Sequence, residues 1–297
     1  MEWAIGIYTG ETPFQLDSPD AIHNPVLTRH SVNDRRAEFV ADPFMLPNDV
    51  GWHMFFEVMN GKSRKGEIGV ATSADGFRWE YQQIVLSERF HLSYPCVFEW
   101  AGDYYMIPES FQARSVRLYR ADEFPTRWSL VTTLLDGNQY VDASIFRFDE
   151  RWWLFVGQGA PPYRADTLRL FNASELTGPW LEHPQSPVVA ADRSSARPAG
   201  RVLSHNGRLI RYGQDCSRHY GTRVLGFEIQ ELTTASYQER EIVGNPVLAA
   251  SGLGWNESGM HHLDARPMND GSWIACVDGY FFRSNEAGDS SLNDEVK

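Results

Sequence analysis

Several features that define other classes of protein are scarce or missing in this 297-residue sequence. Its three cysteines, Cys96, Cys216 and Cys276, are odd in number and scattered, which does not suit a disulfide framework or a Cys-x-x-Cys metal site. No apolar run approaches the roughly 20 residues that a membrane helix needs. Phosphate-binding loops, Gly-x-Ser-x-Gly nucleophile motifs and metal-ligand spacings are also missing. We therefore expect no membrane insertion, no metal and no cofactor.

Positive charge is scarce too. The sequence has 27 Lys and Arg residues against 39 Asp and Glu, a formal net charge of −12 at pH 7. Such a field repels nucleic acids and anionic membrane surfaces, so a nucleic-acid partner is not expected. The first residues lack the basic and apolar regions of a signal peptide, which favours a cytoplasmic location, with a processed secreted form as the alternative. Nothing in the sequence indicates an oligomeric state.

Aromatic residues, in contrast, make up 13% of the chain and favour strands over helices. They occur in a unit that repeats five times, roughly every 50 to 65 residues. Each copy begins with a short strand, turns, and returns as an aromatic strand; the first strands lie at 40–44, 93–98, 141–146, 196–200 and 261–264, and the returning strands at 52–57, 104–109, 152–157, 209–215 and 273–278. A repeat of this length is typical of a four-stranded propeller blade.

The outer half of the unit also repeats, at 68–79, 118–128, 168–180 and 224–237, but the fifth copy has none. Its counterpart lies near the N-terminus, where the strand at 5–8 is followed by an Asn-Pro-Val-Leu tetrad (24–27) that recurs at 245–248. We therefore predict an all-β fold: a single five-bladed propeller over residues 1–297, in which the N-terminal strands within residues 3–28 complete the last blade. Residues 285–297 are expected to form a flexible tail. A β-sandwich is the alternative.

The repeat also predicts a pocket. The start of each first strand and the end of each returning strand must lie at the same end of the axis, and these positions are polar in all five units. They comprise Asp42, Glu57, Tyr94, Glu109, Asp142, Gln158, Arg197, Gln214, Asp215, His261, His262, Asp264 and Asp278. We expect the carboxylates Asp42, Glu57, Glu109, Asp142 and Asp215 to crowd together, so that at least one has a raised pKa. The alternative is that these residues only line a water-filled channel.

Crowded carboxylates suit glycoside cleavage. That reaction needs one protonated carboxylic acid for the leaving oxygen and one ionised carboxylate to activate water or attack carbon. Neighbouring carboxylates push each other's pKa values apart, which separates the two roles. Arg197, His261 and His262 would hold sugar hydroxyls or an anionic substituent. The expected partner is therefore a carbohydrate or glycoconjugate.

Several motifs resemble those of known propellers. Ala41-Asp42-Pro43-Phe44, the inner strand at 141–146 and the outer-strand run at 71–79 are similar to the five-bladed glycoside hydrolases of families 43, 32 and 130. Over nearly the whole chain, through residues 39–44, 197–200, 214–216 and 261–264, the sequence resembles the propeller domain that precedes the transferase in plant glucosamine inositolphosphorylceramide transferases, and related bacterial domains.

The family 43 resemblance implies that Asp42 is the base, that Asp142 tunes the acid, and that an inner-strand Glu is the acid. No inner strand here begins with Glu, so we take Glu109, at the end of a returning strand, as the acid. The remaining polar positions are then expected to bind substrate. The resulting hypothesis is a glycoside hydrolase-like enzyme. The main alternative is a non-catalytic carbohydrate-binding or accessory propeller in surface-glycan biosynthesis, and a nucleotide-sugar transferase is a more distant one.

Overall fold

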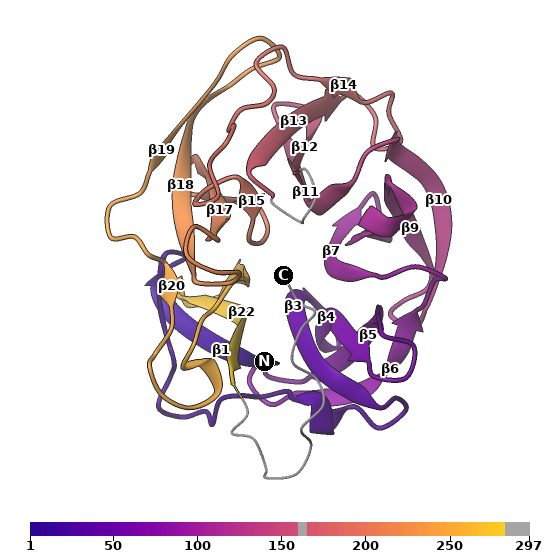
Figure 1. The fold of residues 1–297 in the computed structure, drawn as a ribbon, viewed down its shortest axis with the longest axis vertical. Helices are drawn as coiled ribbons and strands as arrows, with labels where there is room; N and C mark the ends of the chain where they lie inside the picture. The colour runs from indigo at the N-terminus through magenta and orange to yellow at the C-terminus, as the bar shows by residue number, and fades with distance from the viewer. Residues whose placement is uncertain (160–164, 283–297) are drawn as a thin grey trace.

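The computed structural model describes residues 1–159 and 165–282. Its strands form five antiparallel sheets around a central axis (Figure 1), which confirms the predicted all-β, five-bladed propeller. In the described part, helix is limited to three short 3-10 turns, Arg29–Ser31, Phe111–Ala113 and Gly254–Asn256. Within these residues no helix is long and apolar enough to span a membrane. The tail predicted at 285–297 lies outside the described residues.

The first four blades follow one another along the chain. Blade 1 contains β3 (Ala37–Asn48), β4 (Gly51–Asn60), β5 (Lys65–Ser73) and β6 (Glu80–Leu86). Blade 2 contains β7 (Ser93–Trp100), β8 (Asp103–Glu109), β9 (Ser115–Glu123) and β10 (Arg127–Asp136). Blade 3 contains β11 (Tyr140–Phe148), β12 (Arg151–Gln158), β13 (Thr167–Ala173) and β14 (Leu181–Glu182). Blade 4 contains β15 (Arg197–Pro198), β16 (Leu203–His205), β17 (Arg208–Asp215), β18 (Arg223–Leu232), β19 (Tyr237–Glu241) and β20 (Leu248–Ala249).

The fifth blade is built from both ends of the chain, as predicted. Its order is β21 (Leu263–Pro267), β22 (Trp273–Phe281), β1 (Glu2–Thr12) and β2 (Gln15–Asp17). Strand β1 pairs antiparallel with β22, with Ile7 opposite Cys276 and Gly10 opposite Trp273. This pairing closes the ring and covers the edge that β22 would otherwise expose.

The repeated Asn-Pro-Val-Leu tetrad has a structural role in both of its copies. The Asn24 side chain accepts a hydrogen bond from the backbone N–H of Ile7 (2.8 Å) and donates one to its carbonyl (2.9 Å). Asn245 makes the same pair of bonds to Gly226, at 2.8 and 3.0 Å. In blades 5 and 4, the Asn side-chain amide therefore makes the two hydrogen bonds that a backbone residue of a neighbouring strand would make.

A bulge recurs in the inner strands of the first three blades. The register with the second strand shifts between Ala41 and Phe44, Ser93 and Cys96, and Val141 and Ser144. Within these shifts Asp42, Tyr94 and Asp142 have φ angles of 53°, 43° and 51°. Left-handed backbone is costly for residues other than glycine and re-aims the side chain at a bulge. These three side chains are thereby directed to the axis.

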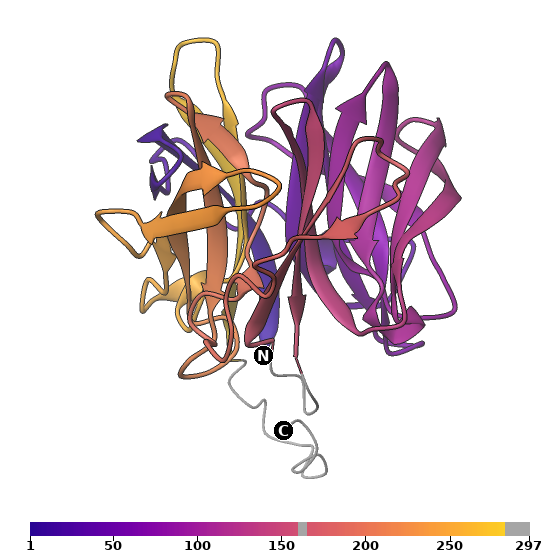
Figure 2. The ribbon, with the colours of Figure 1, turned by 90° about the horizontal axis from the view of Figure 1, so that it is seen from above.

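The strands of all blades run along the axis, with the N-terminus at the lower end in the view of Figure 2. Apolar side chains fill the space between neighbouring blades; the largest buried cluster joins blades 1, 2 and 3 through residues such as Phe55, Leu118 and Leu154. The three cysteines are buried and free. This packing holds the inner strands rigidly and positions the polar residues at their ends.

Candidate functional site

Five carboxylates gather at the end of the axis where the inner strands begin. Each is at most 6% exposed. They come from four blades: Asp42 on β3, Glu57 on β4, Glu109 on β8, Asp142 on β11 and Asp278 on β22. Two cationic side chains, Arg197 on β15 and His261 before β21, lie among them. We call these seven residues the acidic cluster.

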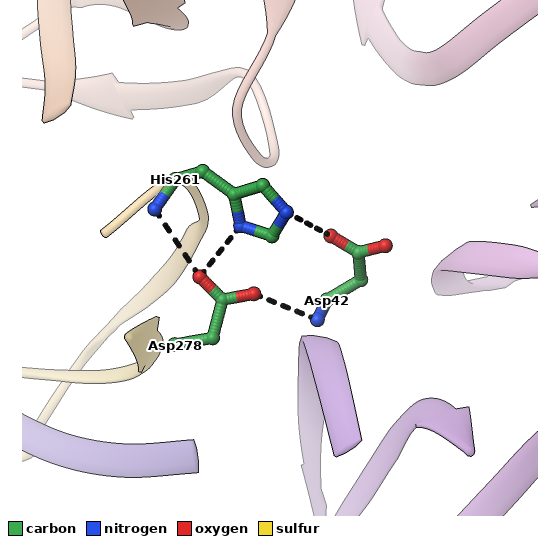
Figure 3. Close-up of side chains that lie close together, drawn as sticks. All are labelled: Asp42, His261 and Asp278. Atoms are coloured by element: carbon green, nitrogen blue, oxygen red, sulfur yellow. Dashed lines mark hydrogen bonds and ion pairs between the residues drawn. The ribbon is translucent and has the colours of Figure 1, made fainter. Parts of the chain in front are cut away.

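Three members of the cluster, Asp42, His261 and Asp278, are joined by the hydrogen bonds and the ion pair drawn in Figure 3. Asp278 Oδ1 lies 2.8 Å from His261 Nδ1, and Asp278 Oδ2 accepts the backbone N–H of Asp42 at 2.9 Å. The other ring nitrogen, His261 Nε2, faces Asp42 Oδ1 at 3.7 Å. Asp278 therefore fixes both the His261 ring and the backbone of Asp42.

A second group surrounds Arg197. Arg197 Nε donates to Asp142 Oδ2, and Arg197 Nη2 lies 3.7 Å from Glu109 Oε2. Gln214 Nε2 donates to Asp142 Oδ2 at 3.0 Å, and the backbone N–H of Asp142 points to Glu109 Oε2 at 3.3 Å. Asp142 Oδ2 therefore accepts two side-chain hydrogen bonds, and Arg197 lies between Asp142 and Glu109.

Glu57 differs from the other carboxylates. Among the described residues its Oε1 is buried and has no hydrogen-bond partner. His91 Nε2 lies 3.4 Å away, outside good hydrogen-bond geometry, and His91 Nδ1 accepts the backbone N–H of Gly66 at 2.9 Å. That bond leaves the ring proton on Nε2, facing Glu57. Burial lowers the pKa of His91 to about 4, so this histidine brings no charge to Glu57 at neutral pH.

The pKa values of the cluster divide according to these partners. Burial raises the pKa of Asp42 to about 7, with His261 opposing and Asp278 and Asp142 adding to the rise. Burial and the charges of Asp42 and Glu109 raise the pKa of Glu57 well above its usual range. Burial and Asp142, opposed by Arg197, do the same for Glu109. The prediction of at least one raised carboxylate pKa is confirmed.

In the pair formed by His261 and Asp278, the pKa shifts favour the charged form of each group. Burial opposes ionisation of Asp278, but the charge and hydrogen bond of His261 outweigh it and lower the Asp278 pKa. Burial likewise opposes charge on His261, and Asp278 outweighs it and raises the His261 pKa. One site thus holds protonated acids beside ionised carboxylates.

Tyr94 and His262 form a floor beneath the cluster. The Tyr94 ring contacts both Phe44 and His262 edge to face, and its hydroxyl accepts the backbone N–H of Gly200 at 2.6 Å. Gly200 has a φ of 145°, and a Cβ there would lie 1.8 Å from the carbonyl oxygen of Leu263. Only glycine fits this close approach, which ties blade 4 to blade 5 under the pocket.

The family model described as "Glucosamine inositolphosphorylceramide transferase 1, N-terminal" matches residues 1–280. The chain belongs to this family.

Curated relatives of the chain are named glucosamine inositolphosphorylceramide transferase 1. The protein from Oryza sativa subsp. japonica is 36% identical over 309 residues, covering 98% of this chain and 41% of the relative. The protein from Arabidopsis thaliana is 33% identical over 298 residues, covering 93% of this chain and 39% of the relative. The chain thus spans about two fifths of the length of these relatives.

Solved structures similar to this family member are propeller glycoside hydrolases. They include the GH62 α-L-arabinofuranosidase catalytic domain of Coprinopsis cinerea, with a TM-score of 0.60 and 15% identity over 79% of this chain and 80% of that one. A second is an exo-β-1,3-galactanase of Clostridium thermocellum, with a TM-score of 0.59 and 13% identity over 72% of this chain and 51% of that one. At this identity the likeness establishes the shared fold alone.

Three residues predicted for the pocket have other partners in this transferase-family propeller. The Gln158 side chain accepts from Arg169 on β13. Asp215 pairs with Arg223 at 2.7 Å, and this ion pair with the Ser217 hydrogen bonds outweighs its burial and lowers its pKa. Asp264 bonds Arg201 at 2.8 Å. Asp215 therefore does not join the crowded carboxylates, and that part of the prediction is wrong.

Gln158 does not occupy the position in blade 3 that Glu57 and Glu109 occupy in blades 1 and 2, and the strand register explains why. Glu57 pairs with Ala41 and Glu109 with Ser93, each just before a bulge. The equivalent partner of Val141 in blade 3 is Gly157, which has no side chain to offer. Gln158 is one residue further, and successive strand residues face opposite sides.

Some pocket residues were missed by the sequence reasoning. Tyr220, 38% exposed, lies edge to face against His261 at 5.0 Å and under the Arg197 guanidinium, also at 5.0 Å. Trp3 stacks on His261 at 4.0 Å. Tyr220 and His91 lie in loops, outside the repeat that identified the other residues. Trp3 could have been identified from its position on β1, the strand that closes the ring.

Asp42, His261 and Asp278 could each offer one atom to a metal ion, and these atoms lie within 4.8 Å of one another. However, His261 Nδ1 and both Asp278 oxygens already serve hydrogen bonds within the trio. The trio therefore fits a hydrogen-bonded network better than a set of metal ligands.

Proposed function

We propose that the acidic cluster binds a sugar or glycoconjugate and hydrolyses a glycosidic bond. The observation that carries this proposal is the coexistence, in one buried site, of carboxylates with strongly raised pKa values and carboxylates paired with cations. Glycoside cleavage requires both forms at once. The shared fold with propeller glycoside hydrolases supports the same reading.

Asp42 is the proposed base or nucleophile. A pKa of about 7 lets it accept a proton near neutral pH, and a base is most effective when its pKa lies near the working pH. His261 and the backbone contact to Asp278 hold its position. Asp142, held by Arg197 and Gln214, is the proposed tuning carboxylate beside Glu109.

The acid has two candidates. Glu109 is the one inferred from the sequence, and its raised pKa suits the role. Glu57 is the second, because its pKa is also raised and it faces neither an arginine nor another donor of good geometry among the described residues. A proton on Glu57 is therefore free to be donated to a leaving oxygen.

The relatives' name suggests which sugars to test first. They are named for glucosamine. A protonated sugar amine would pair with the Asp42 carboxylate once that group is ionised. Amino sugars are therefore the first ligands to test. Tyr220 would supply an aromatic face beside them.

A non-catalytic sugar-binding propeller is the second candidate. One observation favours it: Glu109 is engaged by Arg197 and the backbone of Asp142, so the sequence-based acid is tied into the protein. In that case the propeller would recognise a glycan for an activity located elsewhere.

The test combines turnover with binding. Wild-type protein is screened on oligosaccharides and aryl glycosides that include amino sugars, with calorimetry for affinity. Asp42→Asn should lower turnover at least ~10²-fold while changing affinity little. Asp215→Asn, whose carboxylate pairs with Arg223 outside the cluster, is the matched control and should keep full turnover.

Comparing Glu57→Gln with Glu109→Gln identifies the acid. The acid's variant should be severely impaired on natural glycosides and much less on activated aryl glycosides, whose departure needs little protonation. Sugar binding by the wild type without any turnover would contradict hydrolysis and support the binding function.

A further inference from the structure

A second charged group lies deeper along the axis, below the floor made by Tyr94 and His262. Arg201 and Asp264 form its centre: Arg201 Nε donates to Asp264 Oδ1 at 2.8 Å, and Arg201 Nη2 donates to the carbonyl of Val97 at 2.7 Å. Asp264 Oδ2 also accepts the backbone N–H of Met45 at 2.8 Å. This ion pair is internally satisfied.

Arg266 is the third member and is not satisfied. Its Nε donates to the carbonyl of Met45 at 3.0 Å and lies 3.7 Å from Asp264 Oδ2. Its Nη2 is buried and has no hydrogen-bond partner among the described residues. A buried donor without an acceptor costs about 1–3 kcal/mol, and more when it is charged.

The local charge does not balance. Arg201 and Arg266 share a single carboxylate, Asp264, which is fully buried. Burial and the charge of Arg201 lower the pKa of Arg266 to about 10, a value at which it is still charged at neutral pH. The group therefore carries one excess positive charge inside the propeller.

The neighbouring thiols do not supply the missing negative charge. Burial raises the pKa of both Cys96 and Cys276, so both remain protonated. Cys276 Sγ donates instead to the carbonyl of Pro43 at 3.1 Å. Among the described residues, Asp264 is therefore the one carboxylate that faces the two arginines.

We propose that Arg266, with Arg201 behind it, binds a small monovalent anion of halide size at its Nη2 atom, on the far side of the floor from the acidic cluster. Arg266 lies three residues beyond Leu263 along β21, toward the opposite end of the axis, and its side chain is 19% exposed. This site is independent of the proposed hydrolysis.

The test compares anions at constant ionic strength. The 297-residue chain is melted in sodium gluconate, whose anion is much larger than a halide ion, with increasing replacement by chloride or bromide. A ligand that binds only the folded state raises Tm in a saturable way. We expect Tm to rise by a few degrees and then level off.

Arg266→Met removes the excess charge and should abolish this halide dependence. Arg223→Met is the matched control: it removes an arginine whose carboxylate partner, Asp215, lies away from this group, and it should keep the wild-type response. Crystals of the wild type grown in bromide provide a second measurement that does not require the variant to fold. An anomalous peak is expected within hydrogen-bonding distance of Arg266 Nη2.

Equal Tm values in gluconate and halide, with no bromide peak at Nη2, would mean that water serves this donor, and would overturn the proposal. A bromide peak without a saturable effect on Tm would mean an adventitious ion only and would overturn it as well.

Discussion

At the scale of single residues, the partner of each carboxylate determines its protonation. Asp278 is ionised because the His261 ring and three backbone N–H groups, those of Asp42, His261 and His262, surround it. From the described part of the chain, Asp42 receives only the N–H of Tyr94 at 3.3 Å and the more distant His261 ring. Glu57 receives no bond of good geometry from the described residues. Burial is similar for all three, so the difference in pKa follows from these contacts.

The raised pKa of Asp42 predicts how stability depends on pH. Because its pKa of about 7 in the folded protein lies above the unfolded value near 3.8, its contribution is fully present below pH 4 and is lost as pH rises through 7. Asp42→Asn lacks this loss. The difference in Tm, variant minus wild type, should therefore become more positive by several degrees between pH 5 and pH 8.

Calorimetric melts at matched ionic strength measure this difference. Asp278 stays ionised over the range, because its pKa is lowered, and adds no slope of its own. The pKa of the Asp215 carboxyl is also lowered, so Asp215→Asn serves as a control. Its difference in Tm from the wild type should stay constant between pH 5 and pH 8. A flat difference for Asp42→Asn would contradict the assigned pKa.

At the scale of elements, the bulge in the inner strands of blades 1, 2 and 3 is the unit that builds much of the site. It places Asp42, Tyr94 and Asp142 in left-handed backbone at the same point of three blades. Tyr94 interrupts the series of aspartates, and its ring lies across the axis as part of the floor. One repeated backbone feature therefore gives both the acidic groups and the surface beneath them.

Tyr94→Phe tests the floor. The change leaves the buried N–H of Gly200 without its acceptor and removes a bond to Ser144 at 2.8 Å, which should cost about 1–3 kcal/mol of unfolding free energy. Sugar affinity should change little, because all five carboxylates of the acidic cluster lie on strands other than β7, which carries Tyr94. Urea denaturation and calorimetry measure the two effects. Tyr140→Phe, which loses a bond to Asn138 at 3.1 Å, should cost less.

A tenfold loss of sugar affinity in Tyr94→Phe, with unchanged stability, would instead mean that the hydroxyl contacts substrate, as the sequence reasoning expected. The structure favours the floor because the Tyr94 hydroxyl is already bonded to Ser144 and Gly200.

The regular elements were predictable and the loops were not. Alternation along the strands and the repeat located Asp42, Glu57, Glu109 and Asp142, because equivalent positions of equivalent blades meet at the axis. A one-residue offset was enough to select Gln158 where Gly157 faces Val141. Tyr220 and His91 lie in loops, and nothing in a loop's sequence indicates which distant side chain it will contact. Charge pairing across blades, as between Arg201 and Asp264, has no sequence period either.

At the scale of the whole molecule, one pairing holds the ring closed. Nine residues of β1 pair with β22, and Ile7, fully buried opposite Cys276, packs in the cluster that joins blades 5 and 1. The acidic cluster depends on this closure, because Asp278 and His261 belong to the closing blade and Trp3 on β1 stacks on His261. Binding and folding should therefore be coupled through the N-terminal strand.

Ile7→Ala tests this coupling. Truncating a buried isoleucine costs about 2–5 kcal/mol. If the ring unfolds as one unit, the denaturation midpoints followed by tryptophan fluorescence and by far-ultraviolet circular dichroism should fall together. Tryptophans lie in several blades, including Trp128 in blade 2 and Trp153 in blade 3, far from the change along the chain. Val131→Ala on the outer strand β10 is the control, because this side chain is 43% exposed. It should change the free energy of unfolding by less than about 0.5 kcal/mol. Separate transitions, with the closing blade lost first and the rest of the propeller intact, would show that the pairing of the termini is a local contact and that the ring does not depend on it.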